Sequence, residues 1–168
     1  YEYYAATGYL HKIIQDPNGI NAITQFAYDS VGNITSVTNA INQTTNFVYN
    51  ALNQLKTITS PIPFSYQTKY SYDANGNLTK LERQTNLQHI PWQTTEYTYT
   101  PLDQLETIKQ FLNPTIFLLT TFSYDLNGNR SSVTDANNKT TTYTYDERDL
   151  IWKTTDALNN TTEYAYDL

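Results

Sequence analysis

The stretch that decides the fold runs from Tyr124 to Asp146 and reads YDLNGNRSSVTDANNKTTTYTYD. It opens with a Tyr-Asp pair, passes through Asn-Gly-Asn and continues into a short segment that contains Ser and Val. A second polar turn, Asp-Ala-Asn-Asn-Lys, leads into a Thr-rich run that closes on another Tyr-Asp pair. Thr, Tyr and Val favour strands, whereas Asn, Asp and Gly favour turns. We therefore predict a β-hairpin that is copied along the chain.

A tyrosine marks each copy, at intervals of 21 to 27 residues. We call these tyrosines the anchors: Tyr4, Tyr28, Tyr49, Tyr72, Tyr99, Tyr124, Tyr145 and Tyr166. Two residues before every anchor except the first stands a partner aromatic residue: Phe26, Phe47, Tyr70, Tyr97, Phe122, Tyr143 and Tyr164. Side chains two residues apart point to the same face of a strand. Each repeat should therefore end a strand with an aromatic pair on one face, and we predict that stacking the hairpins buries these pairs.

A turn follows each anchor. Four residues after the anchor the chain has glycine (Gly8, Gly32, Gly76 and Gly128) or an Asn or Asp (Asn53, Asp103 and Asp149). These residue types tolerate a positive φ most readily. An aspartate directly follows five anchors, and its carboxylate can accept hydrogen bonds from the amides of the turn. Six residues after the anchor the chain is apolar again, with Arg130 as the exception.

A second class of turn is expected at the other end of the hairpins, at 38–44, 134–140 and 155–161. Proline-containing loops replace it at 60–63, at 89–92 and at 113–114, because proline suits loops and not central strands. The repeats also alternate between two types. One type has Gly-Asn after the Tyr-Asp, and the other has Leu or Arg before an Asn or Asp, which gives a two-repeat period of about 44 to 52 residues.

Composition excludes several classes of protein. The 168 residues include no Cys, which rules out disulfides, thiolate metal sites and a Cys nucleophile. The net charge of −6 argues against a nucleic-acid partner, and no apolar run is long enough for a membrane span. With 28 Thr, 18 Asn and 16 Tyr the composition indicates an all-β protein. We predict a single array over residues 1–168 of about seven hairpins, forming a long curled antiparallel strip, a β-shell or β-solenoid-like arrangement. Because the sequence starts at Tyr1 without Met, we expect this array to be an excerpt of a longer chain.

These motifs resemble the YD repeat of Rhs proteins, of the cocoon-forming components of bacterial Tc toxins and of teneurins. The resemblance covers essentially the whole chain and is closest at Tyr124–Asp146. The chain departs from it at Ala5, Asn50 and Thr100, where the family has Asp. The resemblance implies a sheet that spirals into a hollow shell, often around a toxic polypeptide. The self-cleaving core segment that ends such a shell is not visible in this sequence.

Candidate sites are few, and we predict no catalytic, cofactor or metal residue. Asp73–Asn77 and Asp125–Asn129 look superficially like Ca²⁺ loops, but their Gly comes too early and no bidentate Glu follows. His11 and His89 have no partner at ligand spacing, and no catalytic triad is evident. The N-x-S/T sequons are candidate glycosylation sites or by-products of turn composition: Asn33, Asn42, Asn77, Asn129, Asn138, Asn159 and Asn160. Among them Asn42, Asn138 and Asn159 or Asn160 should be the most accessible.

The aromatic residues could instead bind a sugar or choline. Pairs within strands indicate a packed face, so Trp92 and Trp152 are the better binding candidates, with Trp92 expected in an exposed loop. The apolar run 116–119 should rebuild a strand after the Asn113-Pro114 turn, or contact a partner.

Three functions remain open. The first is a structural, non-enzymatic wall of a shell around a polypeptide cargo. The second is an extracellular fibre or adhesin, with or without glycans, and the third is a carbohydrate-binding module. The first two imply a secreted or cell-surface protein whose neighbours are further repeats.

Overall fold

The computed structural model describes residues 1–87 and 90–167, excluding the side chains of residues 87, 90 and 91. It consists of fifteen strands and no helix in these residues, and the order of strands in the sheet follows the chain from β1 to β15. Consecutive strands pair antiparallel, as in the hairpin Phe122–Val133. The predicted all-β antiparallel strip is confirmed.

The strands of the sheet are short. They are β1 (Glu2–Tyr3), β2 (Leu10–Gln15), β3 (Ala22–Tyr28), β4 (Ile34–Thr38), β5 (Thr44–Tyr49), β6 (Leu55–Thr59), β7 (Gln67–Tyr72), β8 (Leu78–Leu87), β9 (Ile90–Tyr99), β10 (Leu105–Phe111), β11 (Phe117–Tyr124), β12 (Arg130–Thr134), β13 (Thr140–Tyr145), β14 (Ile151–Thr155) and β15 (Thr161–Glu163).

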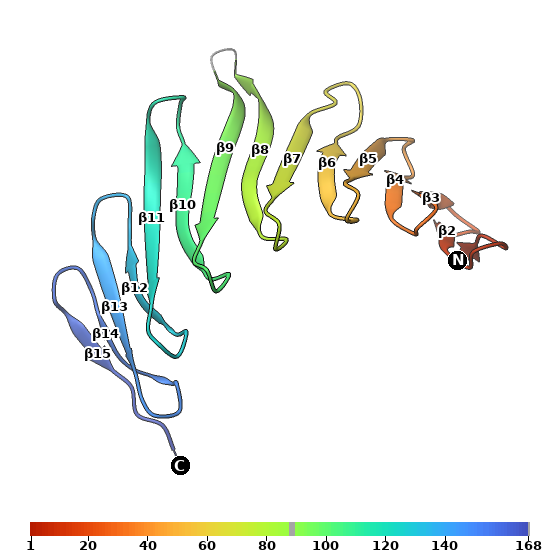
Figure 1. Cartoon of the computed structure of the whole chain (residues 1–168). Helices are drawn as coiled ribbons and strands as arrows, with labels where there is room; N and C mark the ends of the chain where they lie inside the picture. The colour runs from red at the N-terminus through yellow and green to blue at the C-terminus, as the bar shows by residue number, and fades with distance from the viewer. Residues whose placement is uncertain (88–89, 168) are drawn as a thin grey trace. The chain divides into compact units, whose positions relative to one another are not determined.

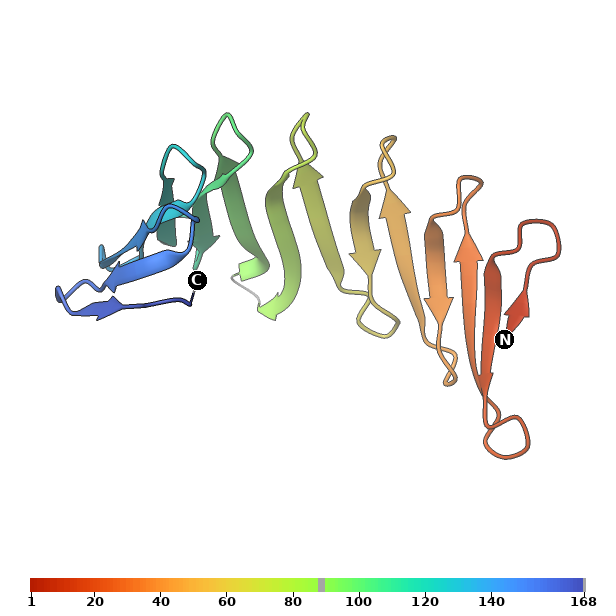
Figure 2. The same cartoon turned by 90° about the horizontal axis from the view of Figure 1, so that it is seen from below.

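The chain divides into two compact units. The first unit comprises Tyr1–Ser71 and Leu81–Trp92, and the second comprises Tyr72–Lys80 and Gln93–Leu168. Within each unit the connections lie alternately at the two ends of the strands (Figures 1 and 2). We call the end that carries the turns after the anchors the YD rim, with turns at 29–33, 50–54, 73–77, 100–104, 125–129 and 146–150. The other end is the distal rim, with turns at 16–21, 39–43, 60–66, 112–116, 135–139 and 156–160.

The register places the aromatic pairs on one face. Phe26 lies opposite Val37 in the first unit, and Phe122 lies opposite Val133 in the second. The other face is rich in hydroxyl groups. Some of them form hydrogen bonds across strands, as the Oγ1 atoms of Thr98 and Thr107 do at 2.8 Å. Each unit therefore has an aromatic face and a polar face, as the period-two pattern predicts.

No side chain in the described ranges is fully buried. The aromatic pairs at 26 and 28 and at 143 and 145 are half-buried, and Tyr164 and Tyr166 beside the last strand remain 46% and 44% exposed. A folded domain normally packs two layers against each other, whereas neighbouring strands of one sheet cover each other's rings only from the side. The predicted burial of the aromatic face is thus met only in part.

Two loop predictions had different outcomes. Strand β11 begins at Phe117 after the turn at 112–116, so the predicted return of a strand after Asn113-Pro114 is confirmed. The expected exposed loop at Trp92 is wrong, because β9 already begins at Ile90 and Trp92 lies half-buried within it. His89, which the prediction placed in that loop, lies outside the described residues.

Candidate functional site

The anchor tyrosines connect neighbouring repeats through their hydroxyl groups. In five repeats the hydroxyl donates to the backbone carbonyl six residues after the preceding anchor, at 2.8 to 2.9 Å. The bonds run from Tyr28 to Leu10, Tyr99 to Leu78, Tyr124 to Leu105, Tyr145 to Arg130 and Tyr166 to Ile151. We call this series the tyrosine ladder. Tyr4 differs, because its hydroxyl donates to the carbonyl of Phe26 at 3.0 Å.

A β-bulge explains why these carbonyls need a partner. After five of the YD turns the register shifts by one residue; for example, Tyr124 pairs with Arg130 whereas Ser123 pairs with Ser132. A bulge interrupts the hydrogen bonds of the ladder at that point. The hydroxyl of the next anchor then supplies the donor. Trp152 is such an extra residue, since Tyr145 pairs with Ile151 and Thr144 with Lys153.

Desolvation raises the pKa of two of the ladder hydroxyls. Partial burial raises the pKa of Tyr99, and the nearby Tyr97 and Asp73 raise it further. Partial burial also raises the pKa of Tyr145, although the Arg130 guanidinium opposes the shift. A phenol that stays neutral remains a hydrogen-bond donor, as the ladder requires.

Sequence reasoning missed the ladder, although a signal was present. The anchor is Tyr in all eight repeats, whereas the partner position two residues earlier has Phe in three of seven. Both residue types provide an apolar ring, so only a role for the hydroxyl explains why the anchor is always Tyr. The spacing alone does not show where that hydroxyl points.

Each YD turn is held by the residue that follows its anchor. The Oδ1 atom of Asp29 accepts the backbone amides of Val31 at 3.0 Å and Asn33 at 2.9 Å. Gly32 has a φ of 96°, which glycine adopts at little cost. The same two bonds occur at Asp73, Asp125 and Asp146. The glycines at positions 8, 76 and 128 also have positive φ.

Two of the three departures from Asp, at Asn50 and Thr100, retain this arrangement, whereas Ala5 has no side-chain oxygen. The Oδ1 atom of Asn50 accepts the amides of Leu52 and Gln54, both at 2.9 Å. Thr100 accepts the equivalent amides through Oγ1 at the longer distance of 3.3 Å. A side-chain oxygen is therefore enough to hold the turn, and the charge of Asp is not required.

The distal rim uses the same turn, although the sequence suggested a separate class. The Oδ1 atom of Asp156 accepts the amides of Leu158 at 2.8 Å and Asn160 at 2.9 Å. Asn159 follows three residues after the capping residue with a φ of 65°, as Gly32 does on the YD rim. The turns that begin at Asn39 and Asp135 have the same bonds. Three distal-rim turns, at 39–43, 135–139 and 156–160, therefore share the five-residue turn of the YD rim, whereas those at 16–21, 60–66 and 112–116 differ from it.

Hydrogen bonds lower the pKa of two capping carboxylates, Asp29 and Asp156. The side-chain amide of Asn33 makes the largest contribution at Asp29, and the side-chain amide of Asn160 does so at Asp156. Both bonds stabilise the ionised form. These carboxylates are accordingly charged when the turns are formed.

Neighbouring YD turns are also bonded to each other. The side-chain amides of Asn127 and Asn129 donate to Oδ1 of Asp149 in the next turn, at 3.1 and 2.6 Å. Asn75 and Asn77 donate in the same way to Asp103, at 2.8 and 2.7 Å. We call each such connection a turn clasp. In the first unit Asn33 donates to Asn53 at 2.9 Å.

The clasps explain why two types of repeat alternate. The Gly-Asn turns carry the amide donors, and the turns of the other type place an oxygen acceptor at their positive-φ position. A Gly-Asn turn therefore needs the other type as its successor. The two-repeat period visible in the sequence follows from this pairing.

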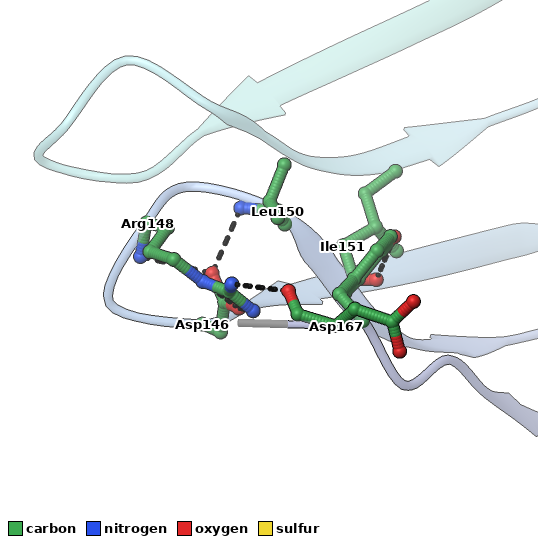
Figure 3. A network of polar contacts seen from close by, with 6 residues as sticks. Asp146, Arg148, Leu150, Ile151 and Asp167 are labelled. Atoms are coloured by element: carbon green, nitrogen blue, oxygen red, sulfur yellow. Dashed lines mark hydrogen bonds and ion pairs between the residues drawn. The ribbon is translucent and has the colours of Figure 1, made fainter.

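Arginines occupy two special places in the second unit. Arg148 binds Oδ2 of Asp146 through Nη2 at 2.9 Å and reaches the carbonyl of Asp167 at 3.2 Å (Figure 3). It thereby connects its turn to the next repeat. Arg130 replaces the usual Leu or Ile, and its guanidinium lies 5.2 Å from the ring centroid of Tyr143, where a cation–π contact is favourable.

The sequons fall into two groups. The side-chain amides of four of them are bonded within or between turns: Asn33, Asn77, Asn129 and Asn160. The other three lie exposed on the distal rim with positive φ and, in the described structure, no side-chain bond: Asn42, Asn138 and Asn159. The second group is sterically free to carry a modification.

The candidate ligand-binding tryptophans are partly covered by lysines. The Nζ atom of Lys69 lies 4.3 Å from the ring centroid of Trp92, and that of Lys153 lies 5.7 Å from Trp152. His11 packs against Tyr4, with ring centroids 4.3 Å apart. At the apolar run, Lys109 lies 4.1 Å from the Phe117 ring centroid. Among the described side chains of this group, we find no arrangement that converges on a ligand.

Comparison with known proteins identifies the repeat. The family model described as Teneurin YD-shell matches residues 4–91, just over half of the chain, and the RHS Repeat model matches residues 124–157. No curated protein matches the chain. Among the described residues there is no helix long and apolar enough to cross a membrane.

Solved structures share the fold. The structure of the Photorhabdus luminescens Tc holotoxin pore is similar with a TM-score of 0.74 at 19% identity, over 95% of this chain and 9% of that one. The crystal structure of TcdB2-TccC3 gives 0.73 at 18% identity, over 97% of this chain and 11% of that one. This chain thus spans about a tenth of the length of these proteins. With the family match over residues 4–91, the chain belongs to the teneurin YD-shell family of YD and Rhs repeat proteins.

Proposed function

We propose that this strip is a non-catalytic wall segment of a closed shell that houses a polypeptide cargo, a secreted toxin in the bacterial members. The observation that carries the proposal is the recurring bonding between neighbouring repeats, through the tyrosine ladder and the turn clasps. These bonds make a sheet cohesive without a second layer. The membership of a YD-shell family and the fold shared with a Tc holotoxin support the same function.

The half-buried aromatic face fits a wall. Its rings are covered from the side by neighbouring repeats, yet none is sealed by an opposing layer in the described structure. Such a face can border an enclosed space or contact a cargo. Isolation of a cargo requires an impermeable wall and no chemistry from it, which agrees with the structural character of the repeat.

The test uses the full-length protein that contains this strip. After native proteolysis, a shell should leave a protected polypeptide that lies outside the repeats and becomes cleavable once the protein is denatured. Electron microscopy of the same sample should show a closed hollow particle. A rod, or a sample in which every segment outside the repeats is cleaved under native conditions, would contradict the proposal.

A second candidate is an extracellular fibre or adhesin that carries glycans. The observation in its favour is that Asn42, Asn138 and Asn159 all lie exposed on the distal rim with free side-chain amides. Mass spectrometry of the protein from its natural source should then find glycans at these three positions and none at Asn33. A carbohydrate-binding module is a weaker candidate, because Lys69 covers the ring of Trp92. If it were correct, replacing Trp92 would abolish sugar retention without unfolding the chain.

A further inference from the structure

Three tyrosines line an open cleft of the first unit, at the turn between β1 and β2. Tyr4, Tyr9 and Tyr28 form its aromatic wall, and the cleft has a volume of about 300 Å³. The ring centroids of Tyr9 and Tyr28 are 5.0 Å apart, and those of Tyr4 and Tyr28 are 6.3 Å apart. Tyr4 and Tyr9 are 37% and 38% exposed, so a ligand can reach their rings. We call this space the tyrosine cleft.

The cleft exists because the sequence departs from the repeat at this turn. In the other three YD turns that contain Gly, the asparagine five residues after the anchor donates to the next turn, as Asn129 does to Asp149. After the first anchor, that position holds Tyr9. Its ring lies over the next turn, where a Cβ atom at Gly32 would be 2.6 Å from the Tyr9 hydroxyl. Thr7 is short and leaves room beside these rings. An aromatic cleft therefore replaces a turn clasp.

The second unit fills the corresponding place with an arginine of its own. Arg148 stands three residues after its anchor, as Thr7 does in the first unit. Its guanidinium lies 5.9 Å from the ring centroid of Tyr166, the next anchor, and donates to the carbonyl of Asp167 at 3.2 Å (Figure 3). Tyr166 and Asp167 correspond to the Tyr-Asp pair that lines the tyrosine cleft. The repeat thus seats a guanidinium at this place where the chain itself supplies one.

The charge of the cleft also suits a cation. Asp29 is the only charged residue among the described residues that line it. The side-chain amide of Asn33 holds the pKa of this carboxyl below its ordinary value, so the group is charged at neutral pH. The face of a tyrosine ring attracts a cation. A guanidinium fits both features, because it stacks on aromatic rings and donates several N–H bonds to oxygen atoms.

We propose that the tyrosine cleft binds the guanidinium group of an arginine side chain that belongs to another polypeptide segment. The guanidinium stacks on Tyr28 and donates to the oxygen atoms of Asp29, in the way that Arg148 uses Tyr166 and Asp167. The ligand is a side chain because Arg148, its internal counterpart, is one. This contact site is additional to the wall function and does not depend on it.

Peptide binding tests the proposal. The probe is a Gly-Arg-Gly peptide with both termini blocked, and the matched control has citrulline, which keeps the shape of arginine without its charge. The methyl resonances of Ala6 and Ala27 report binding, since both residues line the cleft. The arginine peptide should shift them with a Kd on the order of 1 mM, and the citrulline peptide should not. Equal shifts with both peptides, or a free guanidinium ion that binds as tightly as the arginine peptide, would overturn the proposal.

Three variants provide the second measurement. Thr7→Arg places an arginine where Arg148 stands in the second unit, so it should fill the cleft from within and abolish peptide binding. Asp29→Asn keeps the oxygen that holds the turn, as Asn50 does, but should weaken binding about 3-fold. Asp73→Asn is the matched control in a turn outside the cleft and should bind like the wild type. Circular dichroism should show that all three keep their strands. A Thr7→Arg variant that binds the peptide like the wild type would overturn the proposal.

Discussion

At the scale of single residues, the phenol hydroxyl distinguishes the anchor from its partner. Both positions contribute an aromatic ring to the same face, but only the anchor donates a bond to the preceding repeat. The sequence was sufficient to predict that six anchors, Tyr28 to Tyr145, end a strand, because strand periodicity depends on spacing alone, whereas Tyr4 and Tyr166 lie outside the strands. It was not sufficient to predict the bonded carbonyl, because that carbonyl is released by a bulge one strand away.

Removal of one anchor hydroxyl should weaken the sheet measurably. Tyr124→Phe keeps the ring and deprives the Leu105 carbonyl of its donor, which should lower the free energy of unfolding by about 1 kcal/mol. Urea unfolding followed by circular dichroism measures the change. Tyr143→Phe is the matched control on the same face and should change stability by less than about 0.5 kcal/mol. Equal losses in both variants would show that the ladder bond is not the cause.

At the scale of the turn, one five-residue design serves both rims. The sequence predicted a positive φ after each anchor, and Gly32 and Asp149 have it. It also suggested two classes of turn, because Gly-Asn and Asn-Gln look chemically different. At 39–43, 135–139 and 156–160 the structure shows the same turn as on the YD rim, since the capping oxygen and the positive φ decide the geometry and several residue types supply each of them.

The turn clasp should contribute to stability through its acceptor. Asp149→Gly removes the acceptor of Asn127 and Asn129 but tolerates the φ of 59°, so the expected loss is about 1 kcal/mol. Asp149→Asn retains an acceptor, as Asn53 does in the first unit, and should stay within about 0.5 kcal/mol of the wild type. Chemical unfolding of the two variants side by side makes the comparison. If the Asn variant loses as much as the Gly variant, the clasp has no stabilising role.

Acid should destabilise the turns. The pKa values of Asp29 and Asp156 are lowered from 3.8, so the folded chain binds these protons more weakly than the unfolded chain does. Their contribution is therefore complete above the unfolded value and is lost as the pH falls through the lowered values. The thermal midpoint should be constant between pH 7 and pH 5 and fall below about pH 4. Asp156→Asn cannot titrate and should reduce that fall, whereas an unchanged midpoint of the wild type down to pH 2 would contradict the assignment.

At the scale of the whole molecule, stability comes from contacts between neighbouring repeats. The described residues contain no fully buried side chain, so packing into a central core does not hold this fold together. Composition and the repeat predicted the all-β antiparallel strip, because both depend on local chemistry. The extent of burial could not be predicted, since an i, i+2 aromatic pattern looks alike whether another layer covers it or not.

Deletions should reveal the two-repeat period. Removing residues 125–145 joins Tyr124 to Asp146 and takes away Asn127 and Asn129, the donors for Asp149. Removing residues 100–145 deletes two repeats but places the Gly-Asn turn at 73–77 directly before the turn that contains Asp149. The longer deletion should therefore lower the thermal midpoint of unfolding by less, for each repeat removed, than the shorter deletion does. The reverse order would show that the alternation of turns has no energetic meaning.

The direction of the tyrosine ladder has a consequence for biosynthesis. Five anchors donate to the repeat that precedes them, from Tyr28 back to Leu10 and from Tyr166 back to Ile151. A chain made from its N-terminus can thus add these hairpins to an edge that already exists, without waiting for distant segments. During translation, the last folded strand would offer its free edge to the next hairpin. That edge would be open to aggregation only until the next anchor is translated.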